Sequence, residues 1–230
     1  MVFSIFQKFP GLVLGLSTKA DGAMNSNFFE NRNRFLKKLK ISPKNLVLAQ
    51  LVHQSKISIV FKKDRGEVIP GVDGLLTKSK NTFLGITVAD CLPVFLFDLE
   101  NKAVGLIHCG WRGLARNILS KAVAKMIREF KTNPENILAG IGPGICQNHF
   151  EVKSDVYNKF KKYGAALMFK GKQVFLDLKK IARIQLINSR LKSHNIEVSP
   201  VCTYSCKNKY FSYRRDKKLL VQLAVIGYLQ

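Results

Sequence analysis

The chain contains 230 residues, of which 47% are hydrophobic and 23% are charged, so its length and composition are those of a folded soluble domain and exclude disordered, collagen-like and disulfide-scaffold proteins. Its 38 lysines and arginines outnumber 15 acidic residues and give a net charge of +23, which attracts anions of every class. The basic residues are scattered, and no zinc-finger, recognition-helix or aromatic RNA-binding motif accompanies them, so we do not expect nucleic-acid binding.

Short apolar segments alternate with longer amphipathic ones along the chain. Brief apolar runs bounded by Gly, Pro, Asn or Asp predict strands, and apolar residues that recur every three or four positions predict helices. In chain order we expect a strand at 12–16, a helix at 27–40, strands at 46–52, 57–61, 82–88, 94–97 and 104–107, helices at 114–130, 154–163 and 178–192, and a closing strand at 221–229. No repeat or linker divides them, so a single mixed α and β domain over residues 1–230 is predicted.

The apolar stretch 9–16 near the N-terminus contains Pro10, Gly11 and Gly15. It indicates a buried strand and not a secretory signal, because no small-residue cleavage pattern follows it. No apolar run approaches the roughly 18 residues that cross a bilayer. We therefore expect no membrane partner and a cytoplasmic location.

Five cysteines, an odd number, do not form a disulfide framework, and reduced thiols are expected. Cys202 and Cys206 have the spacing of half a zinc knuckle. No second pair of ligands lies nearby in the sequence, so we do not expect structural zinc there.

His53, Cys91 and His108 each follow a predicted strand. Strand ends are rigid positions whose side chains face a crevice in open sheets. Two imidazoles and a thiolate suit zinc, with a fourth position free for water or substrate. The alternative is that both histidines are buried and satisfied by carbonyl groups, since their spacing matches no compact zinc motif.

Two arginines occupy positions that favour anion binding. Arg32 falls in the middle of the apolar face of the helix at 27–40, where it needs either an internal carboxylate or an anion-binding cleft. Arg112 lies between Gly110 and Gly113 just before the helix at 114–130, where backbone N–H groups are free to hold an anion. The glycines are also explained by tight turns alone.

Five motifs, taken in order, resemble the YfiH-like or laccase-domain family, formerly described as multicopper polyphenol oxidases and now as purine nucleoside phosphorylases. The likeness extends from about Gly15 to the C-terminus. The motifs are Gln50-Leu51-Val52-His53, Val88-Ala89-Asp90-Cys91-Leu92-Pro93-Val94, Ile107-His108-Cys109-Gly110-Trp111-Arg112-Gly113, Ile141-Gly142-Pro143-Gly144-Ile145-Cys146 with Phe150-Glu151-Val152, and Phe211-Ser212-Tyr213-Arg214-Arg215-Asp216.

The resemblance implies an α+β fold of mixed β-sheets layered with α-helices, in the order α/β/β/α. It implies one zinc ion held by His53, Cys91 and His108, with copper as the other metal to consider. The implied reaction is phosphorolysis of adenosine, inosine and methylthioadenosine to the free base and the ribose 1-phosphate, with an adenosine deaminase side activity. Copper-dependent oxidation of polyphenols is the less expected activity, because a single site of two histidines and one cysteine lacks the trinuclear copper cluster that laccases use to reduce dioxygen.

For this reaction we expect Arg32 and Arg112 to orient phosphate, and Asp90 to transfer a proton or to orient the neighbouring ligand. Asp73 and the run Tyr213-Arg214-Arg215 are further candidates, although salt bridges are the expected role of those arginines. The sequence departs from the family at Gln54, which is expected to narrow the site, and at Cys109, which is expected to add a second thiol beside His108. An alternative hypothesis is a cysteine hydrolase or deamidase in which Cys91 is the nucleophile and His108 the base.

Overall fold

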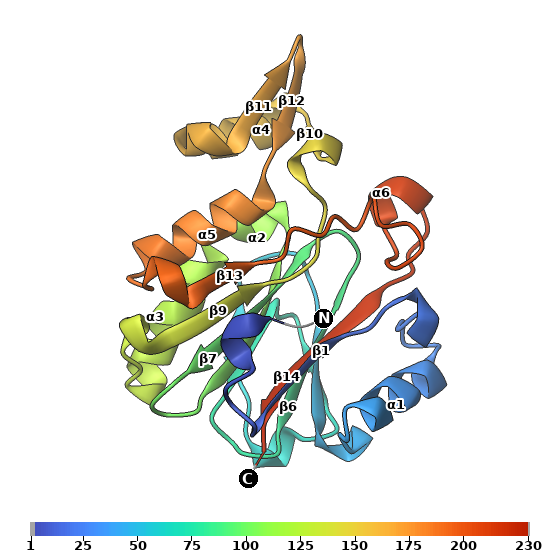
Figure 1. Cartoon of the computed structure of the whole chain (residues 1–230), viewed down its shortest axis with the longest axis vertical. Helices are drawn as coiled ribbons and strands as arrows, with labels where there is room; N and C mark the ends of the chain where they lie inside the picture. Colours follow the sequence, from blue (N-terminus) through green and yellow to red (C-terminus); the bar gives the residue numbers. More distant parts are fainter. Residues whose placement is uncertain (1–2, 230) are drawn as a thin grey trace.

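Two β-sheets face each other in the computed structural model, which describes residues 3–229, and helices cover both outer faces (Figure 1). Sheet 1 has the strand order β1 (Leu12–Leu16), β14 (Gln222–Tyr228), β6 (Phe83–Val88), β2 (Leu46–Gln50) and β4 (Val68–Pro70). Sheet 2 has the order β13 (Ile196–Val198), β9 (Ile137–Ile141), β7 (Leu92–Asp98), β8 (Val104–Cys109), β5 (Gly74–Thr77) and β3 (Ile57–Ile59). Both sheets mix parallel and antiparallel pairs.

Alternation of side chains along each strand builds the layers. In β6, Leu84 and Ile86 face sheet 2, whereas Phe83 packs on the helix outside sheet 1. In β7, Phe95 faces sheet 1 and Leu96 packs under the helices outside sheet 2. Since successive residues of a strand point to opposite faces, each central strand fills two cores. This confirms the predicted α+β class and the α/β/β/α order of its layers.

The helices lie on opposite outer faces. One helix, α1 (Phe29–Lys38), covers sheet 1 with Phe35 and Leu36. The helices over sheet 2 are α2 (Trp111–Ala115), α3 (Ile118–Phe130) and α5 (Leu178–Asn188). Two further helices, α4 (Ser154–Phe160) and α6 (Tyr213–Asp216), lie outside these layers. No helix of the described chain has both the length and the apolar character that a membrane span requires.

The continuous helix predicted at 114–130 is wrong. The structure has two helices, α2 and α3, separated by Asn117 in a left-handed conformation with φ 55° and ψ 46°. Asparagine tolerates this conformation better than most residues. The apolar periodicity runs on across the break because Leu114 and Ile118 both pack against sheet 2.

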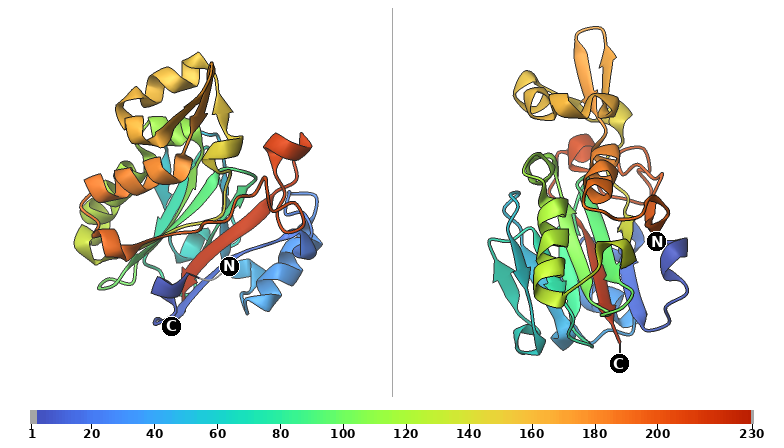
Figure 2. Two further views of the ribbon diagram at one scale, coloured as in Figure 1. Left: turned by 45° about the horizontal axis from the view of Figure 1, so that its top comes forward. Right: turned by 90° about the vertical axis from the view of Figure 1, so that its left-hand side faces the viewer.

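The other predicted elements occur at the expected places with shifted ends. The strand expected at 46–52 ends at Gln50, because the chain leaves sheet 1 there and crosses to sheet 2. Several strands were not predicted, among them β9 of sheet 2 and a small sheet of β10 (Glu151–Val152), β12 (Gln173–Leu176) and β11 (Leu167–Lys170). With α4, this small sheet projects beyond the main layers (Figure 2, right).

Candidate metal centre

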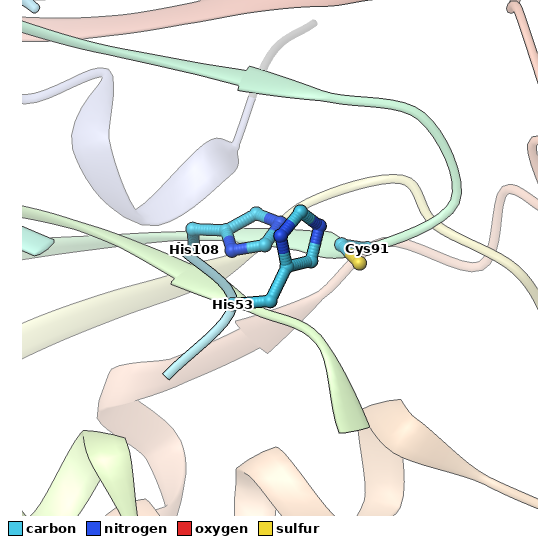
Figure 3. Close-up of side chains that lie close together, drawn as sticks. All are labelled: His53, Cys91 and His108. Atoms are coloured by element: carbon cyan, nitrogen blue, oxygen red, sulfur yellow. The ribbon is translucent and has the colours of Figure 1, made fainter. Parts of the chain in front are cut away.

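The three predicted ligand side chains come together at one end of the main sheets. Each of His53, Cys91 and His108 offers one ligand atom, an imidazole nitrogen or the thiol sulfur, and these three atoms lie within 4.8 Å of one another. The two imidazole rings meet edge to face, with centroids 4.9 Å apart and an interplanar angle of 89°. Figure 3 shows the sulfur of Cys91 beside them. We call these three residues the strand-end cluster.

Two of the chain crossings between the sheets at this end carry a candidate ligand. Residues 51–56 link β2 to β3 and carry His53, and the turn from β6 to β7 carries Cys91. His108 belongs to β8 and pairs with Pro93 of β7. His53 and Asp90 have positive φ values of 56° and 82°, so the backbone adopts an uncommon conformation in each crossing.

A buried carboxylate, Asp73, fixes two of the ligands. Its Oδ1 accepts hydrogen bonds from the backbone N–H of His53 (2.8 Å) and lies 3.2 Å from Nδ1 of His108. Its Oδ2 accepts from the N–H of Gln54 at 2.7 Å. With Nδ1 of His108 directed at Asp73, Nε2 is left to bind an ion, an arrangement found in many metal sites.

The negative groups around His108 favour a positive charge at this position. Burial alone lowers the pKa of His108, but the negative charge of Cys91 and the hydrogen bond to Asp73 outweigh burial and raise that pKa to about 9. The pKa of His53 is lowered, by burial first and then by the charge of His108. A lowered pKa keeps the His53 imidazole neutral, which is the form that binds metal.

Gly110 gives the sulfur of Cys91 its space, because a Cβ at this position would lie 2.9 Å from that sulfur. The expectation that Cys109 adds a second thiol beside His108 is wrong. Adjacent residues of β8 point to opposite faces, and Cys109 is fully buried in the core under α2 and α3. Gln54 contributes its backbone N–H to Asp73 while its side chain is exposed.

Asp90, beside Cys91, is the centre of a hydrogen-bond network that sequence analysis missed. Its carboxylate accepts from Oγ1 of Thr203 (2.7 Å), Oγ of Ser212 (3.0 Å) and the N–H of Arg214 (2.7 Å). Its backbone carbonyl accepts from the N–H of Ile145 at 2.9 Å. The one available signal was the position of an aspartate in a turn next to a ligand.

The two arginines predicted to bind phosphate lie on different layers. Arg112 is exposed at the start of α2, with its guanidinium 4.3 Å from the centre of the Trp111 ring, and its charge contributes to the lowered pKa of His53. Arg32 lies on α1, half-buried, and burial lowers its pKa. Within residues 3–229, Arg32 has neither a salt bridge nor a side-chain hydrogen bond, and no contact joins it to the strand-end cluster.

The arginines of α6 organise loops. Arg215 forms a salt bridge with Asp216 at 2.7 Å and donates to the carbonyl groups of Thr203, Tyr204 and Tyr210. Arg214 donates to the carbonyl groups of His149 and Glu151. The salt bridge expected for these arginines is therefore present at Arg215, whereas Arg214, among the described residues, bonds to carbonyl groups and forms none.

The donor set of the strand-end cluster fits zinc. Two imidazole nitrogens and one thiolate are common zinc ligands, and three protein ligands leave a fourth position for water or substrate. A carboxylate behind one of the histidines is the usual partner of a zinc-bound imidazole. Copper accepts the same types of ligand.

Comparisons with known proteins agree on one family. Residues 8–228 match the family described as multi-copper polyphenol oxidoreductase laccase. The chain is 30% identical over 198 residues to a purine nucleoside phosphorylase of Bacteroides thetaiotaomicron, covering 80% of this chain and 73% of that protein. It is 30% identical over 185 residues to the adenosine deaminase RL5 of an unknown prokaryotic organism, covering 74% and 70% of the two chains. Its fold matches the crystal structure of YlmD from Geobacillus stearothermophilus with a TM-score of 0.90 at 30% identity, covering 97% of this chain and 94% of that chain.

Proposed function

Because this chain belongs to the family described as multi-copper polyphenol oxidoreductase laccase, whose relatives include a protein named purine nucleoside phosphorylase, we propose that it is a zinc-dependent purine nucleoside phosphorylase. Its substrates are adenosine, inosine and methylthioadenosine together with phosphate, and it has adenosine deaminase as a side activity. The name of the RL5 relative supports the side activity. The match over residues 8–228 supports one domain over residues 1–230. A cytoplasmic location stays a prediction.

The observation that carries the proposal is the convergence of His53, Cys91 and His108 in front of Asp73. These three side chains would hold the zinc ion. When bound, zinc supplies Lewis-acid polarisation and lowers the pKa of a bound water, which serves both proposed activities. Asp73 acts as the positioning residue, since it directs Nε2 of His108 to the centre and fixes the backbone of His53.

Cleavage of an N-glycosidic bond requires phosphate next to C1′ of the ribose while the purine departs. Arg112 supplies an exposed cation close enough to act on His53, which supports its proposed role in orienting phosphate. Arg32 is proposed as a second phosphate ligand, supported by a half-buried guanidinium that has no carboxylate partner in the described chain.

Asp90 has two open roles, proton transfer and orientation, and the geometry supports orientation. Both carboxylate oxygens already accept hydrogen bonds from Thr203, Ser212 and Arg214. A proton on this carboxylate would have to displace one of these donors. We therefore propose that Asp90 positions Cys91 through the turn that precedes β7.

The test measures hypoxanthine released from inosine by the metal-loaded protein, with and without phosphate. We expect release that depends on phosphate and yields ribose 1-phosphate. His53→Ala should lower the rate by more than about 100-fold, because it removes a ligand of the ion that activates the substrate. His194→Ala is the matched control, since His194 is an exposed histidine remote from the cluster. Release without phosphate, or an equal rate from His53→Ala, would contradict the proposal.

A second candidate function rests on one observation. Cys91, His108 and Asp73 form a chain of nucleophile, base and orienting carboxylate, which is the arrangement of a cysteine hydrolase or deamidase. Such an enzyme would keep its activity in chelator and lose it on alkylation of Cys91, whereas the phosphorylase would respond to chelator and phosphate. Copper-dependent oxidation of polyphenols, the activity in the family description, is tested by oxygen uptake with the copper-loaded protein.

A further inference from the structure

A second group of side chains that could hold a metal ion lies in two loops that are hydrogen-bonded to Asp90. It consists of Cys146 and His149, from the loop after β9, and Cys202, from the loop after β13, and we call it the loop cluster. One ligand atom from each residue lies within 4.8 Å of the others. All five cysteines of the chain carry free thiols.

The distances within the loop cluster suit three ligands of one ion. Nδ1 of His149 lies 3.2 Å from the sulfur of Cys146 and 3.7 Å from that of Cys202. Zinc bonds of about 2.3 Å to sulfur and about 2.0 Å to nitrogen, at tetrahedral angles, place such atoms about 3.5 Å apart. A nucleophile and its base need only one contact of this kind, whereas here one nitrogen faces both sulfurs.

Backbone contacts hold the two sulfurs in place. Gly144 and Cys202 form an isolated parallel bridge, and the N–H of Thr203 donates to the carbonyl of Gly144 at 3.1 Å. The N–H of Cys146 donates to the sulfur of Cys202 at 3.3 Å, a contact that favours the thiolate. The sulfurs are therefore positioned by the main chain before any ligand arrives.

Separate contacts hold the imidazole and the backbone of His149. Its ring stacks on Tyr204, with centroids 4.3 Å apart and an interplanar angle of 18°, and its backbone carbonyl accepts from Arg214. Oγ of Ser205 lies 3.5 Å from Nδ1 of His149. This hydroxyl, or a water, is available for a fourth position.

We propose that Cys146, His149 and Cys202 bind a second zinc ion, which fastens the loop after β9 to the loop after β13. Two thiolates and an imidazole are zinc ligands of the structural type. The proposal is independent of the enzymatic activity. It differs from the sequence-based expectation of no structural zinc at Cys202, because the fold brings Cys146 and His149 to Cys202, and Cys206 is not part of the group.

The test counts zinc ions per chain by elemental analysis, after the reduced protein has been equilibrated with zinc and the excess removed. We expect two for the unmodified chain and one for each of Cys146→Ser, His149→Gln and His53→Ala. The matched control is Cys206→Ser, which should retain two. Cobalt replacement adds a spectroscopic readout, because sulfur-to-cobalt absorption should be more intense for the loop cluster, with two thiolates, than for the strand-end cluster, with one.

Three results would overturn the proposal. The first is one zinc per chain that His53→Ala removes. The second is an unchanged zinc content in both Cys146→Ser and His149→Gln, with each variant shown to be folded by its unfolding transition. The third is a mass two hydrogens lower under reducing conditions, which would identify a disulfide between Cys146 and Cys202. Each result concerns metal content, so a failure of the proposed phosphorylase activity would leave this test intact.

Discussion

The strand-end cluster and the loop cluster offer similar ligand types on different supports. In the strand-end cluster, His108 lies on a core strand and is oriented by the buried carboxylate of Asp73. In the loop cluster, His149 contacts sulfur and hydroxyl groups and stacks on Tyr204. A carboxylate behind an imidazole tunes a reactive metal, whereas a pair of thiolates between two loops mainly adds stability. The support of each cluster, more than its ligand types, therefore distinguishes the proposed catalytic site from the proposed structural one.

Asp90 connects the two clusters, so its loss should have the largest effect. It precedes Cys91, and its hydrogen bonds hold Ile145 and Thr203, the neighbours of Cys146 and Cys202. Asp90→Asn replaces an acceptor by a donor that faces other donors, and buried groups left unpaired cost about 1 to 3 kcal/mol. We expect the free energy of unfolding to fall by about 3 kcal/mol and the zinc content of both clusters to decrease, as measured by denaturation and elemental analysis.

Asp98→Asn is the matched control for this prediction. Asp98 is the last residue of β7, the strand that begins just after Asp90 and Cys91; it is fully buried and accepts hydrogen bonds from Thr132, Glu100 and Asn101. It should lower stability by a similar amount and leave the zinc content unchanged. An Asp90→Asn protein that keeps full zinc at both clusters would show that the clusters are not connected through this carboxylate.

Asp73→Asn should weaken metal binding at the strand-end cluster and leave the loop cluster unchanged. If the carbonyl of the asparagine takes the place of Oδ1, it can still accept from His108 and His53, but its amide group would then face the N–H of Gln54. Loss of such an orienting partner lowers metal affinity or activity by about 10- to 100-fold. We expect this loss at the strand-end cluster alone, measured by competitive zinc titration and by phosphorolysis. An equal weakening of the loop cluster would mean that the variant disturbs the fold and not the orientation of His108.

The sequence predicted the layered fold and the strand-end cluster, but not the geometry that supports them. Periodicity placed most central strands, because each buries alternate side chains in two cores. It joined α2 to α3, since hydrophobic spacing carries no information on the left-handed backbone of Asn117. Their places after strands made His53, Cys91 and His108 candidate ligands, with buried histidines as the alternative; the family resemblance implied the metal site, and the structure brings the three side chains together.

The loop cluster was not predicted because its members come from two loops that only the fold brings together. Structural zinc at Cys202 and Cys206 was not expected, because no second pair of ligands lies nearby in the sequence; in the fold, Cys146 and His149 approach Cys202 instead. The role of Asp73 was hidden for the same reason, since a lone aspartate before a strand carries no sign of the loop that it binds. Cys109 lies in the core because successive residues of a strand point to opposite faces. The sequence alone allowed this prediction, since Cys109 directly follows His108 in a predicted strand.

The smallest expected effect concerns Asp21, which belongs to neither cluster and serves as a background for the two larger effects. Asp21 accepts from Nζ of Lys38 at 2.6 Å and from the N–H of Thr18 at 2.9 Å. Burial alone raises the pKa of Asp21, but the contacts with Lys38 and Thr18 outweigh it and lower that pKa below its model-peptide value of 3.8. The carboxylate therefore stabilises the folded chain above pH 3.8, and this contribution is lost as pH falls through the lower folded value.

A double-mutant cycle of Asp21→Asn and Lys38→Ala measures the coupling free energy between these two side chains. Because Lys38 is largely exposed, with a side-chain exposure of 63%, the coupling free energy should be only about 0.5 kcal/mol at pH 7. It should vanish at a pH below the folded pKa of Asp21, where the carboxyl group is neutral. Zinc content at both clusters should stay unchanged in all three variants. A loss of zinc here would mean that any lost carboxylate weakens metal binding, and the effects assigned to Asp90 and Asp73 would then not be specific.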